Sequence, residues 1–143
     1  MNKILQIALN GIIIMALSSN IALAQKPEWL PEPGETESTA VRVGNLVFIS
    51  GQASGDTANT DNTGASIEES LNKIRSIATQ MGGDMDHIIK LDLYLTNFDT
   101  DFALFNKIFP KYFSEHYPTR TAVGVSKLSR NHTVAINAVM VVE

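Results

Sequence analysis

The residues best suited to chemistry lie in one segment, Tyr112–Val123, whose sequence is YFSEHYPTRTAV. This segment ends an aromatic-rich helical pattern, turns at Pro118 and brings Arg120 to the start of an apolar strand pattern. A guanidinium at a strand entrance is costly to desolvate unless an anion meets it. Arg120 is therefore a candidate carboxylate-binding residue, and a surface ion pair with a glutamate is the alternative interpretation.

Other familiar chemistry is not indicated by the sequence. The three histidines are far apart and the chain has no cysteine, so we predict neither a metal site nor a cofactor. Ser50 lacks the strained turn of a nucleophile elbow, and no nearby histidine in the sequence would activate it. Gly51–Gly55 is not a phosphate-binding loop, because no Gly-Lys-Ser/Thr follows it.

Length and composition indicate one globular domain. The chain has 143 residues, of which 44% are hydrophobic, enough for a packed core. Its formal net charge is −4 and it contains no cluster of lysines and arginines. This composition argues against nucleic acid as the primary partner.

The first 24 residues have the pattern of a secretory signal peptide. Lys3 precedes a mostly apolar run, and Ala22-Leu23-Ala24 offers small residues where a signal peptidase cleaves. An uncleaved membrane anchor is the alternative, disfavoured because Gln6 and Asn10 interrupt the run. We therefore expect a periplasmic or secreted protein, cleaved after Ala24 and released from the membrane.

The expected domain follows a short lead-in. Residues 25–37 contain three prolines and read as an extended segment, in which Trp29 is expected to dock on the domain surface. Residues 38–143 form the domain. Two β-rich runs, 39–43 and 46–50, flank Gly44-Asn45 and predict a hairpin, and a loop is expected over 56–64.

Two helices and three further strands complete the predicted domain. Residues 66–81 read as an amphipathic helix with a capping box at Ser66 and Glu69. A second helix is expected over 99–116, with an aromatic stripe in the core and a kink or break at Pro110. The remaining strands are predicted at 88–96, 121–125 and 133–142.

The element order is therefore β-β-α-β-α-β-β, which favours an α+β domain with two helices covering one face of one sheet. The other face keeps apolar side chains, including Val139 and Val141. An uncovered apolar face predicts oligomerisation through it.

Several segments together resemble the RidA/YjgF (Rid) family. The resemblance spans roughly residues 38–142, nearly the whole expected domain. Its segments agree in order and spacing: Gly44–Gln52, Leu71–Ile74, Gly82-Gly83, Lys90–Leu95, Asp101-Phe102, Asn106, Tyr112-Phe113 and Pro118–Arg120.

The resemblance implies a chorismate-mutase-like α+β fold with one mixed sheet, assembled as a homotrimer around a central barrel with pockets between subunits. It also implies an enamine/imine deaminase that hydrolyses 2-imino acids, such as 2-iminobutanoate and 2-iminopropanoate, to 2-oxo acids and ammonia. In that mechanism Arg120 holds the substrate carboxylate and the backbone N–H of Ala122 binds the same group. Ser50, Gly51 and Asn106 fall on positions that line the pocket.

Two departures from the family pattern bear on activity. Ala135 occupies the position of the glutamate that orients the attacking water, and the Gly-Pro-Tyr entry motif is missing near Glu37. Losing a water-positioning group typically costs about 10²–10⁴ in rate. That Glu37 reaches the pocket and substitutes in part is a hypothesis.

Three functions therefore stay open. The first is an exported imine deaminase with weakened or altered activity. The second is a non-catalytic trimer that binds small carboxylates, such as 2-oxo acids, through Arg120. The third is a structural or protein-interaction trimer in which Arg120 pairs with an acidic residue.

Overall fold

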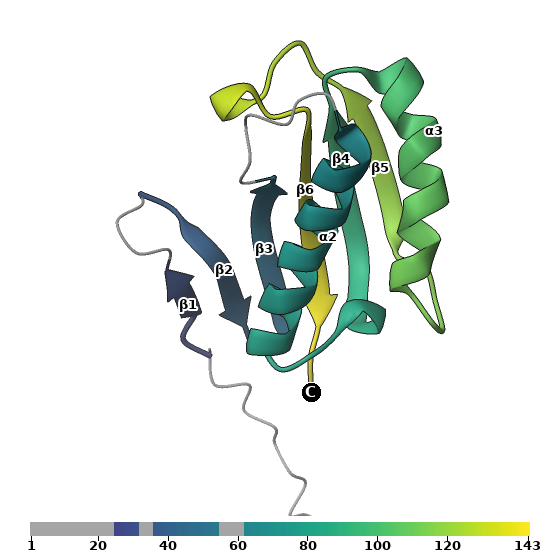
Figure 1. The fold of residues 1–143 in the computed structure, drawn as a ribbon. Coiled ribbons are helices and arrows are strands. Elements are labelled where there is room, and N and C mark those ends of the chain that lie inside the picture. Colours follow the sequence, from purple (N-terminus) through teal and green to yellow (C-terminus); the bar gives the residue numbers. More distant parts are fainter. Residues whose placement is uncertain (1–24, 32–35, 55–61) are drawn as a thin grey trace, which may run out of the picture.

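The computed structural model describes residues 25–31, 36–54 and 62–143, which form one sheet with helices on one side (Figure 1). The helices are α2 (Thr63–Gln80) and α3 (Phe98–Ile108). The strands are β1 (Glu28–Pro31), β2 (Ser38–Val43), β3 (Leu46–Ala53), β4 (Ile88–Leu95), β5 (Thr119–Gly124) and β6 (Val134–Val141). The predicted signal peptide and residues 56–61 of the predicted loop lie outside the described residues.

The sheet has the strand order β1-β2-β3-β6-β4-β5. Neighbouring strands are antiparallel except β4 and β5, which are parallel. A parallel pair needs a crossover, and α3 provides it between β4 and β5. The predicted α+β fold, a mixed sheet with two helices on one face, is confirmed; β1 is a further strand within the segment expected to be a lead-in.

The predicted hairpin is confirmed as β2 and β3. Val43 pairs with Leu46, so Gly44 and Asn45 form the turn, and Gly44 takes the positive φ of 65° that such a turn requires. Strand β3 continues to Ala53, and its register against β6 shifts between Ile49 and Gln52. This bulge places Ser50 and Gly51 at an irregular point of the sheet.

The core lies between the sheet and the two helices. Every second residue of the last strand region, from Val134 to Val142, is buried, as the alternation predicts. These side chains pack with the apolar face of α2, which includes Ile67, Leu71 and Ile74.

Helix α2 begins three residues earlier than predicted. Its N-cap is Asn62, whose side-chain oxygen accepts a hydrogen bond from the N–H of Ala65 at 3.1 Å. The predicted capping box was wrong, because Ser66 lies buried inside the helix and Glu69 accepts a hydrogen bond from Ser54 instead. The predicted loop thus ends before Thr63 rather than at Gly64.

Helix α3 breaks where Pro110 was expected to interrupt it. The α-helix ends at Ile108 and a 3-10 turn, η3 (Phe109–Tyr112), follows. The predicted extension to His116 was wrong, because Phe113 already has extended backbone with φ −124°. Within the described residues, no helix is both long and apolar enough to cross a membrane.

The sheet face opposite the helices carries an apolar row. Trp29 pairs with Val41, Val41 with Phe48, and Phe48 with Val139, so the four side chains lie side by side across four strands. Phe48 is 47% exposed and Trp29 63% exposed in the single chain. The expected docking of Trp29 on its own domain was therefore wrong, and its indole lies open on this face.

We predict that replacing Asn62 with alanine destabilises the protein by about 1 kcal/mol, because an N-cap acceptor is lost. Thermal or denaturant unfolding measures the change. Asn62→Asp is the matched control, because it keeps the acceptor and adds a charge that favours a helix N-terminus. An equal loss of stability in both variants would contradict the assignment of this cap.

Candidate functional site

Arg120 lies within β5 and points toward α3. It pairs with Leu91, a buried residue of the helix-covered face, so its side chain leaves the sheet on that face. Its guanidinium carbon lies 5.2 Å from the ring centre of Phe109, 5.3 Å from that of Phe102 and 5.4 Å from that of Phe105. The aromatic stripe of α3 and η3 thus contributes to the core and is also the surface against which the cation packs.

The guanidinium has aromatic partners in place of an anion. Among the described residues, no carboxylate forms an ion pair with Arg120. Partial burial against the rings lowers the pKa of Arg120 from its usual value, but arginine stays protonated in proteins. Arg120 as a whole remains exposed, so the guanidinium keeps donors available for a ligand. The sequence-based alternative, an ion pair with a glutamate, is not formed within the described part of the chain.

Ala122 follows Arg120 by two residues in β5, and Asn106 lies on α3, whose rings contact Arg120. The N–H of Val125 donates to the carbonyl oxygen of Leu95 in β4. The N–H groups of successive strand residues point to opposite sides, so the N–H of Ala122, three residues earlier, points away from β4 to the open edge of the sheet. Asn106 is exposed. It follows Phe102 by four residues and precedes Phe109 by three, so this spacing places it between two rings that contact Arg120. These three residues form the first group of the site.

Ser50, Gly51 and Ala135 form a second group at β3 and β6. Ala135 pairs with Ala53, two residues beyond the bulge that contains Gly51. Gln52 Nε2 donates to both the carbonyl oxygen and the hydroxyl of Ser50, at 3.2 Å each. A side chain added at Gly51 would meet no atom within 4 Å, so the backbone here is open to a ligand or another chain.

The two groups cannot meet within one subunit. Strands β3 and β5 are three strand spacings apart, roughly 14 Å at about 4.8 Å each. Ala135 also lies on the sheet face opposite the core, whereas Arg120 lies on the helix face. Glu37 is exposed just before β2 and therefore lies nearer to the second group. The expected residues therefore do not form one pocket within a single subunit.

The segment that leads into β5 is fixed at several points. The ring of Tyr117 contacts those of Phe109 and Phe113, with centroids 6.0 Å apart in each case. The Thr119 hydroxyl donates to the carbonyl of Ile89 at 2.9 Å. These contacts fix the backbone immediately before Arg120, and the Thr119 hydrogen bond attaches it to the start of β4.

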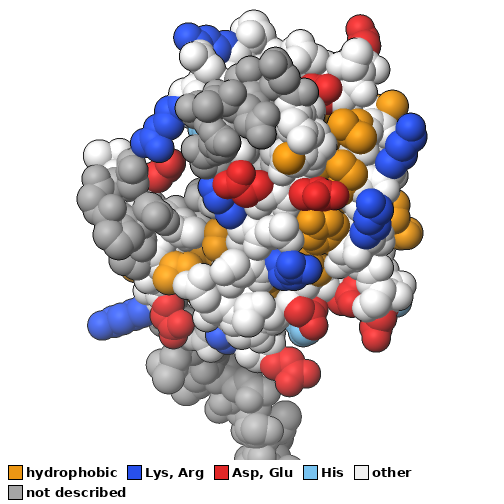
Figure 2. Space-filling view, in the orientation of Figure 1, with side chains coloured by type: hydrophobic (Ala, Val, Ile, Leu, Met, Phe, Trp, Pro, Cys, Tyr) orange, Lys and Arg blue, Asp and Glu red, His pale blue; other side chains and the backbone are white. Residues whose placement is uncertain are grey.

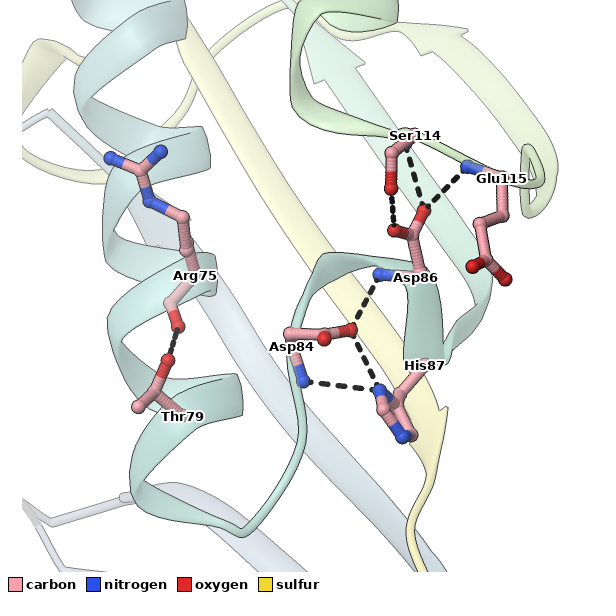
Figure 3. Close-up of polar contacts among 7 residues, drawn as sticks. All are labelled: Arg75, Thr79, Asp84, Asp86, His87, Ser114 and Glu115. Atoms are coloured by element: carbon pink, nitrogen blue, oxygen red, sulfur yellow. Dashed lines mark hydrogen bonds and ion pairs between the residues drawn. The ribbon is translucent and has the colours of Figure 1, made fainter.

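Sequence analysis missed Asp86, whose carboxylate binds the same segment (Figure 3). The N–H groups of Ser114 and Glu115 donate to Asp86 Oδ1 at 3.0 and 3.3 Å, and the Ser114 hydroxyl bonds to Asp86 Oδ2. These donors, the Ser114 hydroxyl first, lower the pKa of Asp86. Asp86 lies in the 3-10 turn η2 (Met85–His87), and no sequence pattern linked it to a segment so distant along the chain.

The face of the molecule that carries the helices is mixed in charge. Figure 2 shows Lys and Arg side chains beside Asp and Glu side chains, with hydrophobic side chains between them on the helix-bearing side. Residues 25–31, 36–54 and 62–143 contain no group of three histidine, cysteine or acidic side chains placed to hold a metal ion.

Comparison with known proteins defines the class. A family model described as Endoribonuclease L-PSP matches residues 31–142, and the chain belongs to this family, that of the RidA and YjgF proteins. The chain is 28% identical over 117 residues to the 2-iminobutanoate/2-iminopropanoate deaminase of Dermatophagoides farinae, with 79% of this chain and 91% of that protein covered. It is 35% identical over 107 residues to a RutC family protein of Sinorhizobium fredii, covering 72% and 84% of the two chains.

Solved structures agree with the fold. RidA from an Antarctic Psychrobacter is 33% identical, with a TM-score of 0.70 over 83% of this chain and 98% of that one. A YjgF-family protein of Neisseria meningitidis has a TM-score of 0.74 at 22% identity, over 85% of this chain and 98% of that one. The second likeness bears on the fold alone.

Proposed function

We propose that the protein is an enamine/imine deaminase that hydrolyses 2-imino acids, such as 2-iminobutanoate or 2-iminopropanoate, to 2-oxo acids and ammonia. The observation that carries the proposal is the Arg120 guanidinium, packed on three phenylalanine rings with no carboxylate of the described residues beside it. The relative from D. farinae bears the name of this activity.

Substrate binding follows from the first group of residues. A guanidinium binds a carboxylate through two parallel N–H donors, and the rings behind Arg120 limit its rotation. The Ala122 N–H at the sheet edge supplies a further donor for the same carboxylate. We propose that the amide of Asn106 contacts the part of the substrate next to the carboxylate.

Hydrolysis needs the imine and the attacking water to be oriented, and it is faster when a group accepts the proton of that water. Once the imine nitrogen is protonated, C2 is electrophilic and water adds to it. The resulting 2-amino-2-hydroxy acid loses ammonia as the C2–N bond breaks, which leaves the 2-oxo acid. Burying the substrate between subunits would hold water and imine in the reacting arrangement.

Ala135 favours one alternative function. Its methyl group neither accepts a proton nor holds a water, so a site with Ala135 at the water position is slower by about 10²–10⁴ than one with a carboxylate there. A trimer that binds 2-oxo or 2-imino acids through Arg120 without turnover is the corresponding alternative.

We also propose that three copies assemble through the uncovered sheet face. The row of Trp29, Val41, Phe48 and Val139 supplies an apolar surface for association. The division of the site into two groups, which one subunit keeps apart, supports the same assembly. Export of the chain to the periplasm or medium, with cleavage after Ala24, is part of this proposal.

The activity test compares the parent chain with Arg120→Ala on 2-iminobutanoate generated in solution. We expect hydrolysis above the uncatalysed rate in the parent and a loss of at least about tenfold in kcat/KM in Arg120→Ala, because charge-assisted hydrogen bonds to the carboxylate are removed. Arg75→Ala is the matched control, because Arg75 also lies over an aromatic ring, that of Tyr112, but on α2.

Ala135→Glu separates turnover from binding. We expect it to raise the rate by about 10²–10⁴ if the pocket is otherwise complete. A parent without activity beside an active Ala135→Glu would make the natural protein a binder. Absence of activity in every variant, together with no binding of 2-oxobutanoate, would refute both functions.

The assembly test uses Phe48→Arg. Phe48 is half-exposed in the single chain, so this change should leave the subunit folded but prevent association, as measured by sedimentation. Trp29 is the only tryptophan, so its emission should move to longer wavelength in the variant as the indole meets water. Thr79→Arg, on the exposed side of α2, is the control. A parent that sediments as a monomer at micromolar concentration would contradict the proposed trimer.

A further inference from the structure

We propose that Asp86 is a positioning residue for Arg120, which it holds in place by fastening the segment that leads into β5. This inference rests on the proposed carboxylate-binding role of Arg120, and it identifies the residue that fixes the position of the guanidinium. It concerns a residue of η2, outside β5 and α3.

The geometry shows a carboxylate that joins two distant parts of the chain. Asp86 Oδ1 accepts the N–H groups of both Ser114 and Glu115, and Asp86 Oδ2 bonds to the Ser114 hydroxyl. The partners are 28 and 29 residues away along the sequence. Both carboxylate oxygens are therefore used to hold one short segment against η2 (Figure 3).

That segment is the only covalent route from the aromatic stripe to Arg120. Helical structure ends at Tyr112, and Arg120 is already the second residue of β5. Between them the chain has no helix or strand to fix its path. Asp86 holds Ser114 and Glu115 near one end, the Tyr117 ring contacts those of Phe109 and Phe113 further along, and the Thr119 hydroxyl bond to Ile89 holds the other end.

The position of the guanidinium depends on the backbone at the start of β5, where Arg120 pairs with Leu91 of β4, and on the segment that leads into it. The guanidinium carbon lies 5.2 to 5.4 Å from three ring centres. The rings belong to the chain before the segment, whereas the backbone of Arg120 comes after it. If Ser114 and Glu115 are released, the start of β5 can shift relative to the rings. Ligand binding then weakens because the donors no longer occupy one fixed place.

Asp84 provides a matched control in the same turn. It caps η2 through Asp86 N–H at 2.9 Å, and its Oδ1 lies 2.7 Å from His87 Nδ1. All of these contacts stay within residues 84–87, so Asp84 stabilises η2 without touching the segment before β5. Removing either carboxylate disturbs the turn, but only the loss of Asp86 frees Ser114 and Glu115.

The direct test is NMR of the Arg120 side chain in the protein produced from the full chain. Rings that lie against a side chain shift its proton resonances upfield. We expect the Arg120 Hδ and Nε–H resonances to move toward their unperturbed positions in Asp86→Ala and to stay in place in Asp84→Ala. Asp86→Asn keeps an acceptor oxygen for the two N–H groups, so it should show a smaller movement.

The second readout is the Kd for 2-oxobutanoate. We expect a rise of at least about fivefold in Asp86→Ala, a partial return in Asp86→Asn and no change in Asp84→Ala. If Asp86→Ala does not fold, Ser114→Ala replaces it, because it removes only the hydroxyl bond to Asp86 Oδ2.

The outcomes separate the two proposals. Unmoved Arg120 resonances in the Asp86 variants, or equal movement in the Asp84 variant, would overturn the positioning role. If the parent neither hydrolyses 2-iminobutanoate nor binds 2-oxobutanoate, the proposed function fails, but the resonances still decide whether Asp86 places Arg120. Shifted resonances with an unchanged Kd would also overturn the inference, because the position of Arg120 would not matter for the ligand.

Discussion

The packing of one guanidinium on the aromatic stripe of α3 and η3 is the interaction on which the site depends. Phe102, Phe105 and Phe109 are needed to close the core over the edge of the sheet, and the same rings meet Arg120. Attraction between a cation and a ring contributes about 0.5–2 kcal/mol, and the larger values apply where the cation is desolvated. The rings offset the cost of partly burying the cation without neutralising it, so its charge stays available for a ligand.

The strand order imposes the second constraint. Because β6 and β4 lie between β3 and β5, the group at Ser50 and Gly51 is separated from the group at Arg120. The last strand, β6, lies in the middle of the sheet and is antiparallel to both of its neighbours. This strand order, and not any side chain, separates the two groups. A site divided in this way gives a reason for the apolar row on the uncovered face: association of copies could complete the pocket and cover that row at once. Subunit assembly and ligand binding would then be linked in this protein.

The fold could be predicted from the sequence wherever the signal is local. Alternation in β4 and β6, the Gly44-Asn45 turn and the break at Pro110 depend on neighbouring residues, and each was predicted correctly. The start of α2 was missed because Ser66 and Glu69 imitate a cap, while the true cap is Asn62. For the candidate site, the sequence placed Arg120 beside an aromatic helix, but direct packing of the guanidinium on the rings was not predicted, because an anion was expected to meet it. Asp86 could not be found at all, since its partners are 28 residues away.

The measurement that tests the central claim most directly is calorimetric binding of 2-oxobutanoate against its uncharged amide. The two compounds differ only in the carboxylate that Arg120 is proposed to hold. We predict saturable binding of the acid, at least about tenfold weaker binding of the amide, and loss of that preference in Arg120→Ala, because alanine has neither the charge nor the N–H donors of the guanidinium. Equal binding of acid and amide, or a preference that survives Arg120→Ala, would contradict the proposed role of Arg120.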